Sequence, residues 1–196
     1  KYFSLNWDIM DQQIFKHFQN VIETTMVVGD AFAEPIANAA EKVSAALLAG
    51  NSIFSCGEKS AMLVAQLFTD YLSHGFEIER PGFPALNLNN MAEDSLGQPR
   101  FAQALNTHGR SADVLLVVSA GENSLSLIQV IEAAIEKDMC VVLLSAANDD
   151  LLGASLGYND VHIATAEFSG QLATQAQFQV IQCVCALVDH QIFGGE

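Results

Sequence analysis

The feature that most constrains this chain is a series of continuous apolar runs separated by helical patterns. The apolar runs cover residues 52–56, 84–88, 113–118, 139–145 and, more weakly, 160–164. Helix-like spacing of apolar residues fills the intervals at about 60–75, 100–108, 124–137 and 168–192. Because the central runs are continuous rather than alternating, they predict parallel strands that helices cover on both faces.

This order of segments predicts an α/β protein: a three-layer α/β/α sandwich around a five-stranded, mainly parallel sheet. Before the first strand, Ile14, Phe18 and Ile22 have helical spacing, and Asp30 is expected to open a second helix that ends near Leu48. We therefore expect a single domain over 1–196, with a helical hairpin at 1–50 and an α/β core at 51–196. A chain of 196 residues is long enough for one sizeable core.

Composition limits the classes of partner. Hydrophobic residues make up 51% of the chain, and this excess predicts apolar surface buried between subunits. The net charge of −15 argues against direct binding of nucleic acid or of an anionic membrane, since both need Lys and Arg. No apolar run approaches the roughly 18–20 residues that span a bilayer. The four cysteines lack metal-site or redox spacing, and we expect a cytoplasmic protein.

Two turns between a strand and a helix are candidate anion sites, because backbone N–H groups at a helix N-terminus favour phosphate. The first turn is "CGEKSA" at 56–61, where Ser60 could donate a hydrogen bond. The second contains Ser119, Asn123 and Ser124. The four side chains predict a pocket for a phosphorylated ligand. Alternatively, Asn123 or Ser124 only caps the helix that follows.

Four segments carry a family resemblance: "CGEKSA" (56–61), "ERPGFPALNLN" (79–89), "DVLLVVSAGENS" (113–124) and "CVCALVDHQIF" (183–193). Together they resemble the SIS (sugar isomerase) domain family, in the branch that holds phosphoheptose isomerases and the DnaA initiator-associating (DiaA-type) proteins. The resemblance implies a flavodoxin-like SIS fold and a homotetramer with ligand pockets at subunit contacts. It also implies that Ser60, Ser119, Asn123 and Ser124 form a degenerate sugar-phosphate pocket.

The catalytic residues of phosphoheptose isomerases are not matched here. The resemblance places a family His and Glu at Leu67 and Tyr71, and a family Gln and His at Thr174 and Gln182. Leucine cannot bind a metal, and a neutral phenol is a poor replacement for a carboxylate in proton transfer. We therefore expect no catalytic residues and no cofactor, with zinc only if the chain is an isomerase after all.

Two glutamates depart from the family pattern in the same turns. Glu58 and Glu122 stand at helix N-termini, where a bound phosphate would lie. At roughly 5 Å and an effective dielectric near 20, each carboxylate would repel a phosphate charge by on the order of 3 kcal/mol. The alternative is that both side chains point outward into solvent.

The sequence favours a non-catalytic protein that resembles the DiaA type, a tetrameric scaffold that binds the replication initiator DnaA and promotes its assembly at the origin. The resemblance assigns partner binding to Ile192 and Phe193, which could instead pack within the tetramer. The alternatives are an enzyme like the isomerases of phosphoheptose (sedoheptulose 7-phosphate), or an SIS module that senses a sugar phosphate.

Overall fold

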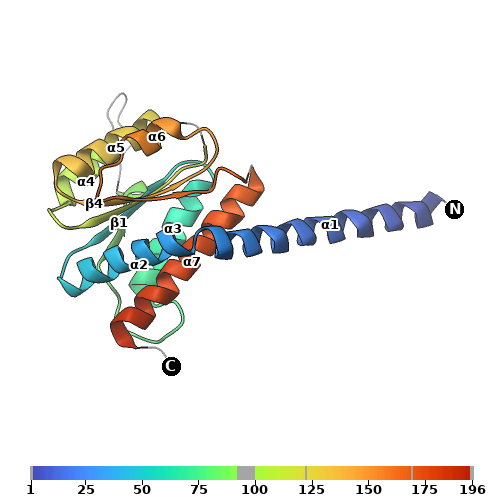
Figure 1. The fold of residues 1–196 in the computed structure, drawn as a ribbon, viewed down its shortest axis with the longest axis horizontal. Coiled ribbons are helices and arrows are strands. Elements are labelled where there is room, and N and C mark those ends of the chain that lie inside the picture. The colour runs from blue at the N-terminus through green and yellow to red at the C-terminus, as the bar shows by residue number, and fades with distance from the viewer. Residues whose placement is uncertain (1, 92–99, 122, 169, 195–196) are drawn as a thin grey trace.

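Five parallel strands form one sheet in the order β2-β1-β3-β4-β5. The computed structural model describes residues 2–91, 100–121, 123–168 and 170–194 (Figure 1). The strands are β1 (Ile53–Gly57), β2 (Ala85–Asn87), β3 (Val114–Val118), β4 (Cys140–Ser145) and β5 (Val161–Ala164). The α/β class, the parallel sheet and the five strand positions are thus confirmed.

Helices cover both faces of this sheet. One face carries α2 (Ala33–Leu48), α3 (Ala61–His74) and α7 (Gln171–Phe193), and the other carries α4 (Arg100–His108), α5 (Leu125–Glu136) and α6 (Asp150–Ala154) (Figure 1). A short 3-10 helix, η1 (Leu88–Asn90), follows β2. The three expected layers are present, and α6 is an element that the sequence did not predict.

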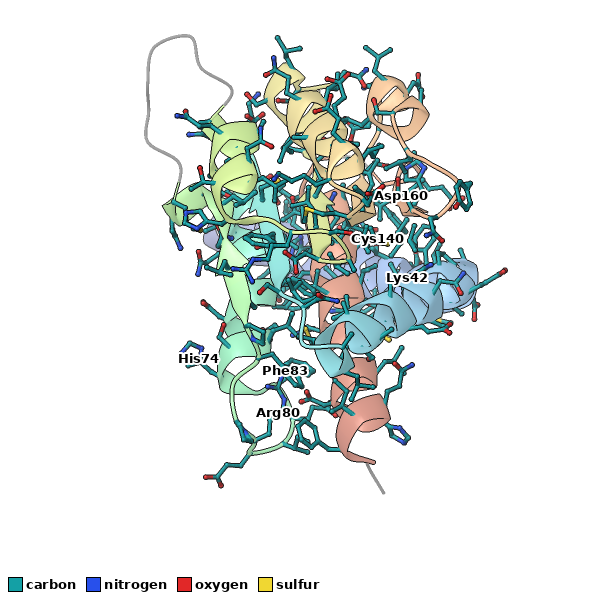
Figure 2. The ribbon with its side chains drawn as sticks, turned by 90° about the vertical axis from the view of Figure 1, so that its left-hand side faces the viewer. Lys42, His74, Arg80, Phe83, Cys140 and Asp160 are labelled. Atoms are coloured by element: carbon teal, nitrogen blue, oxygen red, sulfur yellow. The ribbon has the colours of Figure 1, made fainter. Side chains whose placement is uncertain are left out.

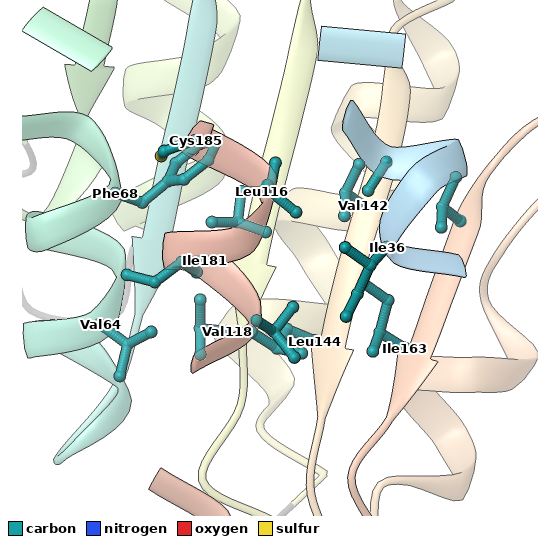
Figure 3. Packing of buried hydrophobic residues seen from close by; sticks show 14 of the residues in the cluster. Ile36, Val64, Phe68, Leu116, Val118, Val142, Leu144, Ile163, Ile181 and Cys185 are labelled. Atoms are coloured by element: carbon teal, nitrogen blue, oxygen red, sulfur yellow. The ribbon is translucent and has the colours of Figure 1, made fainter. Parts of the chain in front are cut away.

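Alternate residues of each strand enter two separate cores, because successive side chains point to opposite faces of a sheet. Leu116 and Val118 of β3 pack with α2, α3 and α7, as Figure 3 shows. Leu115 and Val117 of the same strand pack under α4, α5 and α6. All five residues of β3 are buried, which explains why its sequence is a continuous apolar run.

The N-terminal helices do not form the expected hairpin. Helix α1 (Tyr2–Ala31) continues past Asp30, and only Phe32 separates it from α2. Backbone hydrogen bonds from Phe32 to Val28 and from Ile36 to Phe32 carry the helical pattern across this joint. Pro35 explains the break, since it lacks an N–H and is tolerated only in the first turn of a helix. The chain therefore bends at Phe32 without reversing (Figure 1).

The outer part of α1 projects away from the sheet and its helices (Figure 1). Every residue from 9 to 19 is exposed, and the exposed side chains include Phe15 at 70% and Phe18 at 61%. Within the part of the chain that the structure describes, no helix combines the length and apolar character needed to cross a membrane.

Candidate functional site

The turn after β1 is closed by its own hydrogen bonds. The Gly57 N–H donates to Asn89 Oδ1 over 3.1 Å, and Asn89 Nδ2 donates to the Gly57 carbonyl over 2.7 Å. The N–H groups of Ala61 and Met62 donate to the carbonyls of Glu58 and Lys59. The N–H groups of Gly57, Ala61 and Met62 are therefore used within the fold. Asn89, in the "ERPGFPALNLN" segment, is a contributor that the sequence did not single out.

Glycine at position 57 is required by close packing. A Cβ atom there would lie 2.6 Å from the Ala61 carbonyl oxygen. The glycine of this turn therefore serves the tight passage from β1 into α3. Of the two glutamates, Glu58 is half-buried, and Glu122 lies outside the described residues.

In the turn after β3, Asn123 and Ser124 also form hydrogen bonds within the protein. Asn123 donates its N–H to Asp149 Oδ1 over 3.2 Å, and its Oδ1 accepts from the N–H of Leu151 over 2.9 Å. Ser124 Oγ accepts from the N–H of Leu127, so Ser124 is the N-cap of α5. The capping alternative thus describes Ser124, whereas the side chain of Asn123 accepts from the first turn of α6 (Asp150–Ala154) and not from the helix that follows it.

Ser119 is buried and connects this turn to α7. Its Oγ accepts from the Gly121 N–H over 3.1 Å, and its carbonyl accepts from Gln177 Nε2 over 2.7 Å. The buried Gln177 was not among the sequence-based candidates. Ser119 and Gln177 together fix the turn after β3 against α7.

Ser60 lies at a cavity of about 590 Å³ between α1, α3 and α7. Its Oγ is 3.3 Å from Thr174 Oγ1, across the gap between α3 and α7. The lining residues are Val21, Thr24 and Thr25 of α1, Ser60 with Leu63, Val64 and Leu67 of α3, and Gln171, Thr174, Gln175, Phe178 and Gln179 of α7. Of the four predicted ligand residues, only Ser60 lines this cavity.

Two of the four positions that the resemblance links to catalysis lie at this cavity. Leu67 and Thr174 line it, whereas Tyr71 packs against Phe76 with ring centroids 4.7 Å apart, and Gln182 lies farther along α7. Among the described residues, every side chain that lines the cavity is uncharged. The cavity therefore presents no charged acid or base to a bound sugar.

The side chains at this cavity do not fit a catalytic zinc ion. Zinc in proteins is held by histidine, cysteine thiolate and carboxylate groups. Leu67 has no donor atom, and Thr174 offers a neutral hydroxyl. Across the residues that the structure describes, no three His, Cys, Asp or Glu side chains gather in a way that could hold a metal.

One buried polar atom at the cavity has no hydrogen-bond partner among the residues that the structure describes. Gln175 Oε1 is buried and accepts no hydrogen bond from the described residues. A buried acceptor without a partner is energetically costly, so such an atom marks a place where a further donor would be stabilising. Gln175 is the nearest glutamine to Thr174 along α7 and lines the same cavity.

The other predicted functional residues lie at the far end of α7. Ile192 is half-buried against the core beneath α2, α3 and α7, and Phe193, the last residue of the helix, is 46% exposed. Gly194 ends the helix in a left-handed conformation, with φ of 69°. The structure thus buries part of Ile192 and leaves the ring of Phe193 accessible.

A buried ion pair holds this end of α7. Arg80 Nε donates to Asp189 Oδ1 over 2.6 Å, with 1% and 3% of the two side chains exposed. Arg80 Nη1 and Nη2 also donate to the carbonyls of Leu72 and Tyr71, in the last turns of α3. The "ERP" of one motif and the "VD" of another therefore meet in space and join the ends of α3 and α7.

Comparisons with known proteins agree with this architecture. A family model described as "SIS domain" matches residues 16–146. The DnaA initiator-associating protein DiaA of Shigella flexneri serotype 5b is 31% identical over 191 residues, which are 94% of this chain and 97% of that protein.

Solved structures give the same result for the fold. A phosphoheptose isomerase from Francisella tularensis superimposes with a TM-score of 0.82 at 24% identity, covering 91% of this chain and 97% of that one. A phosphoheptose isomerase from Neisseria gonorrhoeae gives a TM-score of 0.81 at 23% identity, covering 92% and 98%. At 23–24% sequence identity, the similarity to these two isomerases shows that this chain has the same fold and shows nothing about its activity.

Proposed function

This chain belongs to the SIS domain family, and on that premise we propose that it is a non-catalytic, DiaA-like protein that binds a DnaA-type initiator. The observation that carries the proposal is 31% identity to a DnaA initiator-associating protein over 94% of the chain. The uncharged cavity supports it, because Leu67 and Thr174 stand where the isomerase pattern requires a histidine and a glutamine.

The proposed scaffold is a homotetramer assembled in part through α1. Exposed apolar residues recur every four positions along this helix, at Ile14, Phe18, Ile22 and Met26, each more than half exposed. Positions four apart lie on one face of a helix, so these residues form an apolar stripe. A second copy of the chain covering that stripe would remove the apolar surface from water.

The proposed partner is a protein and not DNA. With 23 acidic and 8 basic residues, the chain would repel phosphates, and a scaffold of this charge in the cytoplasm would leave DNA to the initiator. We assign initiator binding to the end of α7, where Phe193 is exposed and Ile192 supports it from the core side.

Capture of the initiator tests this proposal. Purified chain is immobilised, and binding of the DnaA protein from the same organism is measured for the native chain and for Phe193→Ala. We expect the variant to raise Kd at least tenfold, which corresponds to about 1.4 kcal/mol. Leu125→Ala, which removes a 67% exposed side chain from α5, is the matched control and should bind as the native chain does.

Sedimentation of the same variants separates partner binding from assembly. We expect native chain and Phe193→Ala to have the same oligomeric state. Dissociation of Phe193→Ala would assign Phe193 to a subunit contact, and absence of DnaA binding by the native chain would reject the proposed function.

The second candidate is a sugar-phosphate protein, either an isomerase or a sensor. The cavity of about 590 Å³ and the isomerase-like fold favour it. We expect no turnover of sedoheptulose 7-phosphate, with or without added zinc, because the described residues that line the cavity offer no acid, base or metal ligand set. Turnover would overturn the non-catalytic proposal. A large thermal shift without turnover would instead identify a sensor, since ligand at a hundred times its Kd adds about 2.7 kcal/mol.

A further inference from the structure

At the end of α7, the Phe193 side chain contacts a second phenylalanine, Phe83. Its ring stacks on the ring of Phe83, with centroids 5.9 Å apart and planes inclined by 24°. Phe83 comes from the segment between α3 and β2, more than a hundred residues away in the sequence. Both rings reach the surface, since Phe193 is 46% exposed and Phe83 is half-buried. The two phenylalanines therefore form one aromatic patch from two distant parts of the chain.

The Arg80 side chain packs against the Phe83 ring and fixes its position. The guanidinium carbon of Arg80 lies 4.0 Å from the centroid of the Phe83 ring, and Figure 2 shows the two side chains next to each other. Arg80 itself is held by the ion pair with Asp189, on the same helix as Phe193. The N–H of Phe83 also donates to the Leu72 carbonyl over 3.0 Å. These contacts hold both rings of the patch relative to α7.

The segment that carries Phe83 is acidic. The segment that carries Phe83 also carries Glu77 and Glu79, both exposed, with the 39% exposed Ile78 between them. A surface with an aromatic centre and carboxylates at its edge is complementary to a partner that offers an apolar side chain within a basic region. A DNA-binding protein has such basic regions, since its contacts to phosphate are made by Lys and Arg.

We propose that Phe83 and Phe193 form one docking surface for a basic region of the initiator, with Arg80 and Asp189 as positioning residues and Glu77 and Glu79 as its charged edge. The proposal rests on the proposed function and extends it from a helix end to a surface built by two segments. Phe83 supplies the second ring of the surface, and the buried ion pair sets how that ring meets Phe193.

Binding of the purified DnaA protein to Phe83→Ala, Phe193→Ala and the double variant tests the aromatic part. We expect each single variant to raise Kd about tenfold. The double variant should raise it by clearly less than the product of the two, because removing either ring disrupts the same surface. Phe83→Leu keeps an apolar side chain and should fold as the native chain does, while still weakening binding severalfold. Leu125→Ala remains the control.

The salt dependence of binding tests the charged edge. Native chain should lose affinity as salt rises from 50 to 200 mM, and Glu77→Gln/Glu79→Gln should lose less over the same range. An equal salt dependence of native and double-glutamine chains would overturn the assignment of a basic partner region.

The outcomes separate this inference from the proposed function. If Phe193→Ala weakens binding and both Phe83 variants bind as native chain does, the docking surface is wrong and the DnaA-binding role stands. If native chain does not bind DnaA at all, both fall. If the Phe83 variants weaken binding while their unfolding curves and sedimentation match those of native chain, the two-segment surface is supported.

Discussion

The two ends of α7 differ in how completely their polar groups are satisfied. Near the start of the helix, Gln175 lines a cavity and its buried Oε1 has no partner among the described residues. Near the end, Asp189 is buried, with Oδ1 bonded to Arg80 and Oδ2 accepting from the N–H of Phe76 over 3.4 Å. The buried polar side chain of α7 that is paired on both of its oxygens therefore lies at the end remote from the cavity, where the partner surface is proposed.

This difference bears on how an enzyme fold can acquire another role. The cavity end is lined by the uncharged residues Leu67 and Thr174, at two positions where the family resemblance leads us to expect catalytic groups in isomerases. The ion-paired end joins α3 to α7 and would be needed whether or not the cavity had any chemistry. The proposed scaffold role would require the ion-paired end of α7 and would place little constraint on the side chains of the cavity end.

The largest expected effect comes from breaking the ion pair. Asp189→Asn leaves the Arg80 charge buried without its counter-charge, and losing one partner of a buried pair typically costs about 3–5 kcal/mol. Chemical denaturation should therefore show a large drop in the free energy of unfolding. Asp11→Asn, at an exposed position of α1, is the control and should change it little. A loss below about 1 kcal/mol for Asp189→Asn would mean that this end is no more tightly specified than the cavity end.

A smaller effect of opposite sign is expected at the cavity end. Gln175→Met has nearly the same shape and removes the acceptor that lacks a partner, so the free energy of unfolding should rise by about 1 kcal/mol. Gln179→Met, on the same helix and at the same cavity, is the matched control and should not stabilise the chain. Destabilisation by Gln175→Met would show that Oε1 has a bonded partner in solution.

The smallest expected effect is a change in the reactivity of the Cys183 thiol, which depends on Glu77 in the segment between α3 and β2. Partial burial raises the pKa of the Cys183 thiol above its ordinary value, and the nearby Glu77 carboxylate raises it further. The thiolate fraction at pH 8 is thus reduced, and alkylation by iodoacetamide should be slow and should accelerate as pH rises. Glu77→Gln lowers this pKa, so alkylation at pH 8 should become about twofold faster.

Glu79→Gln provides the control for this measurement, because Glu79 shares the segment but is not a source of the Cys183 pKa shift. Equal acceleration by both variants would contradict the placement of Glu77 beside α7. Together the three measurements test whether the carboxyl-terminal end of α7 is fixed by its neighbours while the cavity end is not.

The sheet could be predicted from the sequence because strands that are buried on both faces appear as continuous apolar runs. The run "DVLLVVS" contains β3, and "MCVVLLS" contains β4, since the residues of a parallel strand covered on both faces are mostly apolar. Helix α6 was missed because its five residues are too few to show a helical period. The predicted hairpin is wrong because Asp30 lies inside α1, and Pro35 decides where the second helix begins.

The site was predicted less well, because its contacts join distant segments. Ser124 as an N-cap follows from local spacing, and that alternative was available from the sequence. The pairing of Arg80 with Asp189 spans 109 residues, and no local pattern reports it. Asn89 closing the turn at Gly57 is a contact of the same kind, between segments that only the sheet brings together.

The projecting α1 has a consequence for how the molecule behaves on dilution. Its outer turns are exposed from residue 9 to residue 19, so their amide hydrogens in a lone protomer are protected only by the helix itself. Neighbouring copies would slow their exchange with solvent, and the exchange rate of this one helix would then depend on protein concentration. The amides of β3, which are buried in the sheet, would exchange at a rate that does not depend on protein concentration. They would therefore serve as an internal reference for the exchange rate of α1.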